Sequence, residues 1–184
     1  WLNIDDLQKF RQLNSRTPGH PEVEIPGVEA TTGPLGQGFG MAVGMATAES
    51  MLRASVSELI DHFTYVVAGD GDFQEPVVLG AASMAGHWGL SKLIVFYDSN
   101  NAQISGKVDR SDSTNYAQVF EGFGWHVQEI DGHNHEEIRE ALEKAQVVDR
   151  PSLIIGKTIM AMGSATMEGD HETHGAPLPL DEIA

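Results

Sequence analysis

Two hydrophobic patterns alternate along the last two thirds of the chain. Short apolar-rich runs, typical of strands buried on both faces of a sheet, occupy residues 63–68, 92–97, 125–130 and 152–157. Between them, apolar residues recur at helical spacing, which predicts helices over residues 75–88, 114–122 and from Asn134 to about residue 145. Strands that alternate with helices predict βαβ units. We therefore expect an α/β fold with a doubly wound, mostly parallel sheet of at most six strands and helices on both faces.

The first third of the chain predicts two helices joined by a long loop. Three apolar residues at helical spacing predict a helix over residues 5–13. Residues 14–32 contain three prolines and two glycines, which predicts an ordered or semi-ordered loop of a length that is often functional. A longer helix follows over about residues 35–53. Its Gly36, Gly40, Gly44 and Ala48 form a stripe without large side chains, which favours packing inside the domain and contact with a second subunit equally.

Composition and length narrow the class of protein. The 184 residues correspond to a single domain, 1–184, and the apolar runs are too short for a membrane-spanning helix of roughly 18 residues. The net charge of −16 argues against nucleic acid or an anionic membrane surface as partner, although main-chain N–H groups and a metal could still bind a small anion. The sequence has no cysteine, which is compatible with a reducing cytoplasm. Because the chain begins at Trp1 and not at Met, we expect it to be a piece of a longer protein, whether a natural split subunit or a fragment.

Polar residues follow two successive strands at the points where each is expected to end. Gly69-Asp70-Gly71 comes after the run at 63–68, and Asn100 lies 30 residues beyond Asp70, after the run at 92–97. One strand–helix–strand crossover separates them, so both motifs belong to the same edge of the sheet. A carboxylate and an amide oxygen there could share a hard cation, while the glycines leave room for an anion.

These residues also have an ordinary structural interpretation. Gly, Asn and Asp dominate turns for local conformational reasons, and either motif alone is more often a simple turn. The pair, at this spacing and after apolar strands, favours a metal-bridged diphosphate site. It resembles the fingerprint of thiamine diphosphate enzymes.

Further segments resemble one family of these enzymes, the transketolases. They occur in the family's order along nearly the whole chain, at residues 16–22, 31–38, 96–98 and 174–178. The resemblance implies the thiamine diphosphate-binding fold and most of the family's first, diphosphate-binding domain. The first segment of that domain, the pyrimidine-binding domain and the C-terminal domain would be absent.

The resemblance implies a role for individual residues around the metal. Asp70 and Asn100 would bind Mg²⁺ or Ca²⁺ through side-chain oxygens, and Ala102 would bind it through its main-chain carbonyl. The N–H group of Gly71 would bind the diphosphate.

Other residues are implied to contact the rest of the cofactor and the substrate. Gly33 and Leu35 would lie beside the aminopyrimidine through main-chain groups. His20 would reach the sugar hydroxyls, and His174 would approach both the diphosphate and the substrate. Glu75 resembles a buried glutamate that couples two active sites across a homodimer interface.

The function implied is that of a transketolase: transfer of a two-carbon ketol unit between ketose and aldose phosphates in the cytoplasmic pentose phosphate pathway. Without the pyrimidine-binding domain, we expect this chain alone to be inactive. One alternative is another thiamine diphosphate enzyme, such as a deoxyxylulose phosphate synthase or an oxo-acid dehydrogenase subunit. Another is a non-catalytic Rossmann-like nucleotide-binding module. That module would need a glycine-rich phosphate loop directly after its first strand.

Two residues depart from the family pattern. Asp72 follows Gly-Asp-Gly where an uncharged residue is usual, and its charge would repel a diphosphate unless it points away. Pro76 replaces a glycine after Glu75, which the first turn of a helix tolerates.

His171 and His174 have the spacing of a metal-binding pair, but the supporting ligands of a zinc site are not evident.

Overall fold

A parallel sheet forms the centre of the computed structural model, which describes residues 2–176 and 178–183. Its four strands run in the order β1-β2-β6-β5, and every neighbouring pair is parallel: β1 (Thr64–Gly69), β2 (Leu93–Ser99), β6 (Ser152–Lys157) and β5 (His126–Asp131). A separate antiparallel hairpin follows β2 and consists of β3 (Ala102–Gln103) and β4 (Gly106–Lys107). The predicted parallel α/β architecture is confirmed.

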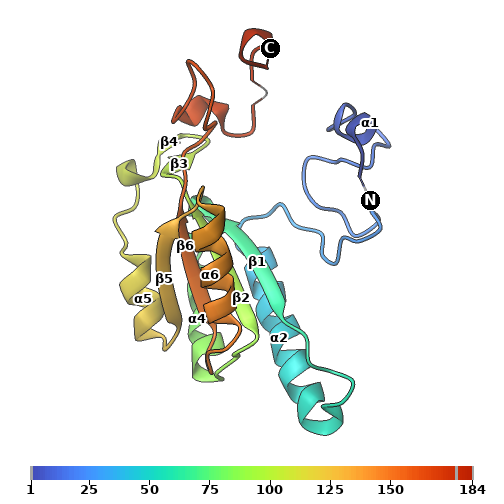
Figure 1. Ribbon diagram of the computed structural model, residues 1–184, viewed down its shortest axis with the longest axis vertical. Helices are drawn as coiled ribbons and strands as arrows, with labels where there is room; N and C mark the ends of the chain where they lie inside the picture. Colours follow the sequence, from blue (N-terminus) through green and yellow to red (C-terminus); the bar gives the residue numbers. More distant parts are fainter. Residues whose placement is uncertain (1, 177, 184) are drawn as a thin grey trace.

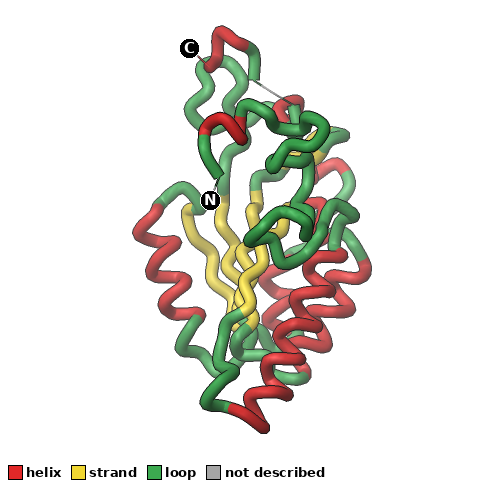
Figure 2. Tube along the Cα trace, turned by 90° about the vertical axis from the view of Figure 1, so that its right-hand side faces the viewer, coloured by secondary structure: helices red, strands yellow, loops and turns green. Residues whose placement is uncertain are grey.

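Helices cover both faces of the sheet (Figures 1 and 2). One face carries α6 (His135–Ala145), and the other carries α2 (Gln37–Val56), α4 (Pro76–His87) and α5 (Tyr116–Gly122). Asn134 caps α6 by accepting from the main chain of Glu136 and Glu137, as expected from the sequence. Pro76 occupies the first turn of α4, where its missing N–H costs no hydrogen bond.

Alternate residues of β2 enter two different cores. Leu93 and Val95 pack on the α2–α4–α5 side in a cluster that includes Trp125, whereas Ile94 packs on the other side against Ala141 of α6. All five residues are at most 2% exposed. A strand buried on both faces needs apolar residues at consecutive positions, which explains the uninterrupted apolar run.

The remaining elements are single turns, namely α1 (Ile4–Leu7), α3 (Asp70–Phe73), η1 (Val108–Arg110), η2 (His171–Thr173) and α7 (Leu180–Ile183). The segments near both ends of the chain lie beyond the carboxyl ends of the strands (Figure 1). Within the described residues, no helix combines the length and the apolarity that crossing a bilayer requires.

The helix expected over residues 5–13 is wrong beyond its first turn. Asn3 and Asp6 form a reciprocal capping box that starts α1, but Arg11 and Asn14 adopt left-handed conformations with φ of 60° and 62°. Leu13, which helical spacing placed on an apolar face, is 93% exposed. A helix of nine residues is not stable without tertiary packing of its apolar face, and the exposed Leu13 has no such packing.

The small-residue stripe of α2 has two environments. A Cβ on Gly36 would lie 2.7 Å from Cγ1 of Val77, and one on Gly40 would lie 3.7 Å from Cγ2 of the same residue. Gly44 has no neighbour within 4 Å of such a Cβ, and Ala48 is exposed. The first half of the stripe therefore packs against α4 within the chain, and a subunit contact through the second half stays a prediction.

Two glycines of α4 give a matched test of how this helix packs against the segment between α5 and β5. A Cβ at Gly86 would lie 1.9 Å from the main-chain oxygen of Phe123, whereas one at Gly80 would have no neighbour within 4 Å. We expect Gly86→Ala to lower the free energy of unfolding by about 1–3 kcal/mol through overpacking. Gly80→Ala should raise it by up to about 1 kcal/mol because alanine favours the helix. Urea unfolding followed by circular dichroism measures both, and equal stability of the two variants would contradict the packing described.

Candidate functional site

Parallel pairing of β1 with β2 brings the two polar motifs together. Gly69, the last residue of β1, pairs with Asp98 of β2. Asp70 then begins α3, and the main-chain N–H of Asn100 donates a hydrogen bond to its Oδ2 at 3.1 Å. The two motifs, one crossover apart in the sequence, are therefore in direct contact at the carboxyl edge of the sheet.

The Asp70 carboxylate is buried and held from two directions. It is 5% exposed, and the Tyr97 hydroxyl donates to its Oδ1 at 2.5 Å. The Tyr97 ring stacks on Phe73 with centroids 4.0 Å apart, so the hydroxyl has a fixed position. In the described part of the chain no lysine, arginine or histidine forms an ion pair with Asp70. A buried carboxylate with only neutral donors is costly, and a cation at this place would offset that cost.

Asn100 and Ala102 complete the set of residues predicted to hold a metal. Oδ1 of Asn100 accepts from the main-chain N–H of Ala102 at 2.9 Å, and Nδ2 donates to Asp98 at 3.3 Å. Asp98 also accepts from the Thr158 hydroxyl, so its carboxylate joins this turn to the residue that follows β6. Among the described residues, no group of three or more His, Cys, Asp or Glu could hold a metal. A metal here would use one carboxylate with amide and main-chain oxygens, a donor set that suits a hard cation.

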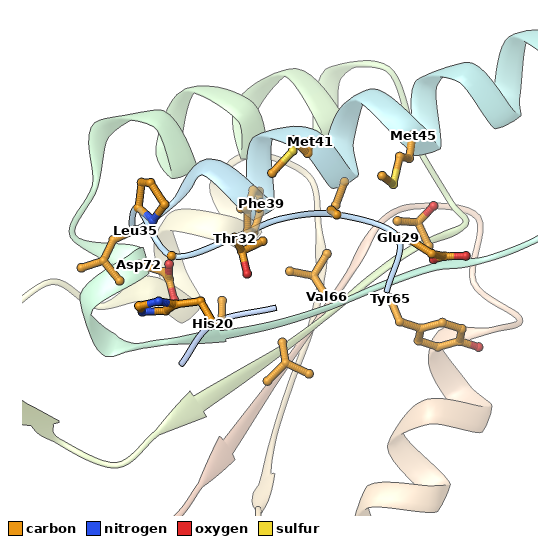
Figure 3. Close-up of a pocket in the computed structure, with 18 of the residues that line it drawn as sticks. His20, Glu29, Thr32, Leu35, Phe39, Met41, Met45, Tyr65, Val66 and Asp72 are labelled. Carbon is orange, nitrogen blue, oxygen red and sulfur yellow. The ribbon is translucent and has the colours of Figure 1, made fainter. Parts of the chain in front are cut away.

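The residues predicted to contact the other end of the cofactor line an open pocket of about 960 Å³. In Figure 3, His20, Leu35 and Asp72 lie at one end of this pocket, between α2 and β1. Gly33, with φ of +145°, approaches His20 so closely that a Cβ would lie 3.2 Å from Cγ of the imidazole. A Cβ on Gly71 would likewise lie 3.2 Å from Cδ1 of Leu35, which joins the pocket to α3.

His174 and Glu75 lie outside this pocket's lining. His174 is exposed directly after η2, which packs against β4, and its N–H donates to the main-chain oxygen of His171 at 3.0 Å. No hydrogen bond within the described residues joins its side chain to those of Asp70 or His20. Glu75 is half-buried at the start of α4, and its Cβ is 2.9 Å from where a Cβ on Gly36 would lie.

One protein-family model matches the sequence of this chain over its whole length. The model described as "Transketolase, thiamine diphosphate binding domain" matches residues 1–184. The chain belongs to the transketolase family. Among curated proteins, Transketolase 2 of Vibrio vulnificus (strain CMCP6) is 51% identical over 189 residues, covering 100% of this chain and 28% of that protein. The transketolase of Halalkalibacterium halodurans is 48% identical over 188 residues, covering 99% of this chain and 28% of that protein.

Solved transketolases share the fold closely. The transketolase of Campylobacter jejuni superposes with a TM-score of 0.95 at 48% identity, covering 99% of this chain and 29% of that one. The transketolase of Leishmania mexicana gives a TM-score of 0.94 at 44% identity, covering 99% and 28% of the two chains. The chain therefore spans less than a third of the relatives it matches. The family match decides against the other thiamine enzymes and the nucleotide-binding module considered above.

Asp72, the departure from the transketolase pattern noted above, is directed to main-chain groups. Its Oδ1 accepts from the N–H of Gly36 at 2.8 Å, and its Oδ2 accepts from the N–H of Gly69 at 2.9 Å. Its charge, expected from the sequence to repel a diphosphate unless it points away, is instead bound by these two N–H groups, which the sequence did not predict. The available signal was the position of Asp72, three residues after a strand end. An acidic side chain at that position can reach back to the residue that caps a helix.

Two tyrosines beside this transketolase site have perturbed acidity. Burial, and then the hydrogen bond to Asp70, raise the pKa of Tyr97 well above its ordinary value. Burial, and then the hydrogen bond to Asp112, raise the pKa of Tyr116 in the same direction. In the unfolded chain both phenols lose their protons near pH 10, whereas in the folded chain they keep them.

Stability should therefore fall at alkaline pH. Both folded-state pKa values are raised, so the stabilisation is complete below about pH 10 and is lost as the pH rises further, by up to about 1.4 kcal/mol per pH unit for each tyrosine. Tyr97→Phe and Tyr116→Phe should each reduce this slope by about one proton equivalent. Urea unfolding of metal-free protein at several pH values between about 8 and 11 measures the slope. A slope unchanged in both variants would contradict the assignment.

Proposed function

We propose that this chain is the cofactor-binding part of a transketolase that transfers a two-carbon ketol unit between ketose and aldose phosphates. The observation that carries the proposal is the buried Asp70 carboxylate in contact with Asn100 at the carboxyl edge of the sheet. Membership of the transketolase family, through the domain that binds thiamine diphosphate, supports it. When bound, thiamine diphosphate supplies the carbon nucleophile and the electron sink for the transfer.

The chain's own residues would fix the diphosphate end of the cofactor. Asp70 and Asn100 would hold Mg²⁺ or Ca²⁺ through side-chain oxygens, and Ala102 through its carbonyl. Their oxygen donors and the single full charge among them fit a hard divalent cation. Gly71 lies in the first turn of α3, where N–H groups have no acceptor within the helix, so its N–H would bind a diphosphate oxygen.

The pocket between α2 and β1 would hold the aminopyrimidine end of the cofactor and the sugar substrate. Gly33 and Leu35 would contact the aminopyrimidine through their main chain, and His20, packed on Gly33, would orient the sugar hydroxyls. His174 would add a hydrogen-bonding group toward the diphosphate and the substrate. Glu75 would transmit contacts between the two active sites of a homodimer.

The complete enzyme would need more than these residues. The chain spans 28% of its curated relatives, and we assign the missing part the pyrimidine-binding domain and the C-terminal domain. Sugar phosphates would be its substrates and a second copy its partner. The cytoplasmic pentose phosphate pathway remains the expected setting.

The metal assignment predicts the behaviour of Asp70→Ala. This change removes the only full negative charge of the proposed metal set, so Mg²⁺-dependent binding of thiamine diphosphate should weaken by at least about tenfold. Calorimetric titration of the full-length protein containing these residues, with and without Mg²⁺, measures the effect. Asp149→Ala, which removes an exposed carboxylate after α6, is the matched control and should bind as the unaltered protein does. Metal-dependent binding unchanged in Asp70→Ala would overturn the Asp70–Asn100 site.

The division of roles predicts that the 184 residues alone do not turn over substrate. The chain would hold the diphosphate, but the part of the site that the pyrimidine-binding domain would place around the aminopyrimidine is missing. The positioning of the reacting end of the cofactor and the acid–base catalysis there would therefore both be lost. Together these effects are commonly worth several powers of ten in rate. A coupled assay of ketol transfer at saturating cofactor and Mg²⁺, with and without the missing domains added as separate polypeptides, tests this. Substantial activity of the chain alone would show that the catalytic groups are all present here.

A further inference from the structure

One carboxylate joins two segments that lie far apart in the sequence. Asp72 is 36 positions from Gly36, yet its Oδ1 accepts the Gly36 N–H at 2.8 Å while its Oδ2 accepts the Gly69 N–H at 2.9 Å. The side chain is half-buried and lines the pocket that also contains His20 (Figure 3). Each oxygen therefore holds one main-chain donor, and charge-assisted bonds of this kind are stronger than neutral ones.

The segment held by Asp72 fits tightly around this bond. Gly36 has φ of +76°, and a Cβ there would lie 2.7 Å from Cγ1 of Val77, so the segment packs directly on α4. One residue earlier, Leu35 reaches α3, where its Cδ1 would lie 3.2 Å from a Cβ on Gly71. The 33–36 segment thus contacts α3 through Leu35 and α4 through Gly36.

We propose that Asp72 is a positioning residue of the cofactor site: its carboxylate sets the 33–36 segment against α3 and the end of β1. The inference rests on the function proposed above, in which Gly33 and Leu35 hold one end of thiamine diphosphate and Gly71 the other. Asp72 acts through the two main-chain N–H groups that its carboxylate holds. Both of its oxygens already accept N–H groups. The cofactor affinity gained by holding the 33–36 segment in place therefore exceeds the affinity lost because the Asp72 charge repels a diphosphate.

Positioning of the 33–36 segment by Asp72 and repulsion of the diphosphate by its charge predict opposite changes in cofactor affinity for the isosteric variant Asp72→Asn. Its amide oxygen can accept from one N–H, but its NH₂ group must face the other, so one bond is replaced by two opposed donors. We expect thiamine diphosphate with Mg²⁺ to bind about tenfold more weakly to the full-length variant than to the unaltered protein. Asp149→Asn, which neutralises an exposed aspartate outside the site, controls for net charge and should leave the affinity unchanged.

A second measurement needs no cofactor. Amide hydrogen exchange of the 184-residue chain, followed by NMR, reports the Gly36 and Gly69 donors directly. We expect Asp72→Ala to accelerate exchange at both amides by at least about tenfold, with exchange in the buried strand β6 unchanged. A general loss of stability would instead accelerate β6 as well, and Asp72→Asn provides the same readout if the alanine variant does not fold.

The outcomes separate this inference from the proposed function. If the unaltered full-length protein does not bind thiamine diphosphate, the proposed function fails and the inference fails with it. If that protein binds, and Asp72→Asn binds equally or more tightly, the positioning role alone is overturned. Unchanged exchange at Gly36 and Gly69 in the variants would overturn it too, whereas weaker binding with local acceleration at these amides supports it.

Discussion

Six successive residue pairs join β1 to β2 in parallel, and the last pair, Gly69 with Asp98, sets where the two strands end relative to each other. This register places Asp70 against the turn that contains Asn100. It also directs Tyr97, one residue before Asp98, toward Asp70 from the same side of the sheet. A slip of one residue would turn Tyr97 to the α6 side and separate the carboxylate from its donor. The apolar side chains that bury β2 on both faces fix this register, so the core determines the geometry of the site.

The sheet and its helices could be predicted because their signals are periodic and repeated. All four strands of the sheet were expected within one or two residues of their observed ends, and Asn134 and Pro76 marked helix starts through local chemistry. The shared sheet edge of Asp70 and Asn100 followed from topology, since one crossover brings successive strand ends to one edge. These features require no knowledge of side-chain direction. The direct contact of Asp70 with Asn100 depends on the pairing of β1 with β2, which the sequence did not predict.

Features that depend on side-chain direction or on distant partners were not accessible in this way. The first helix ended after one turn because nothing in the described chain buries Leu13, which no local pattern reveals. Tyr97 was placed in a strand, but its bond to Asp70 depends on the strand register. The bond from Gly36 to Asp72 spans 36 positions between a loop and a helical turn, and neither segment has a periodic pattern.

The environment of the two carboxylates explains how a domain with a net charge of −16 can present a site for a diphosphate. Asp70 and Asp72 are two residues apart at the same strand end, yet they have different partners. Asp70 has a hydroxyl and one N–H as donors, which leaves its charge available to a cation. Asp72 accepts from two main-chain N–H groups, those of Gly36 and Gly69. One negative charge would thus attract the metal that neutralises the diphosphate, while the other is used to hold the main chain. Because the anion would then meet a metal and N–H groups, the site needs no cluster of basic side chains, and the acidic composition is no obstacle to its function.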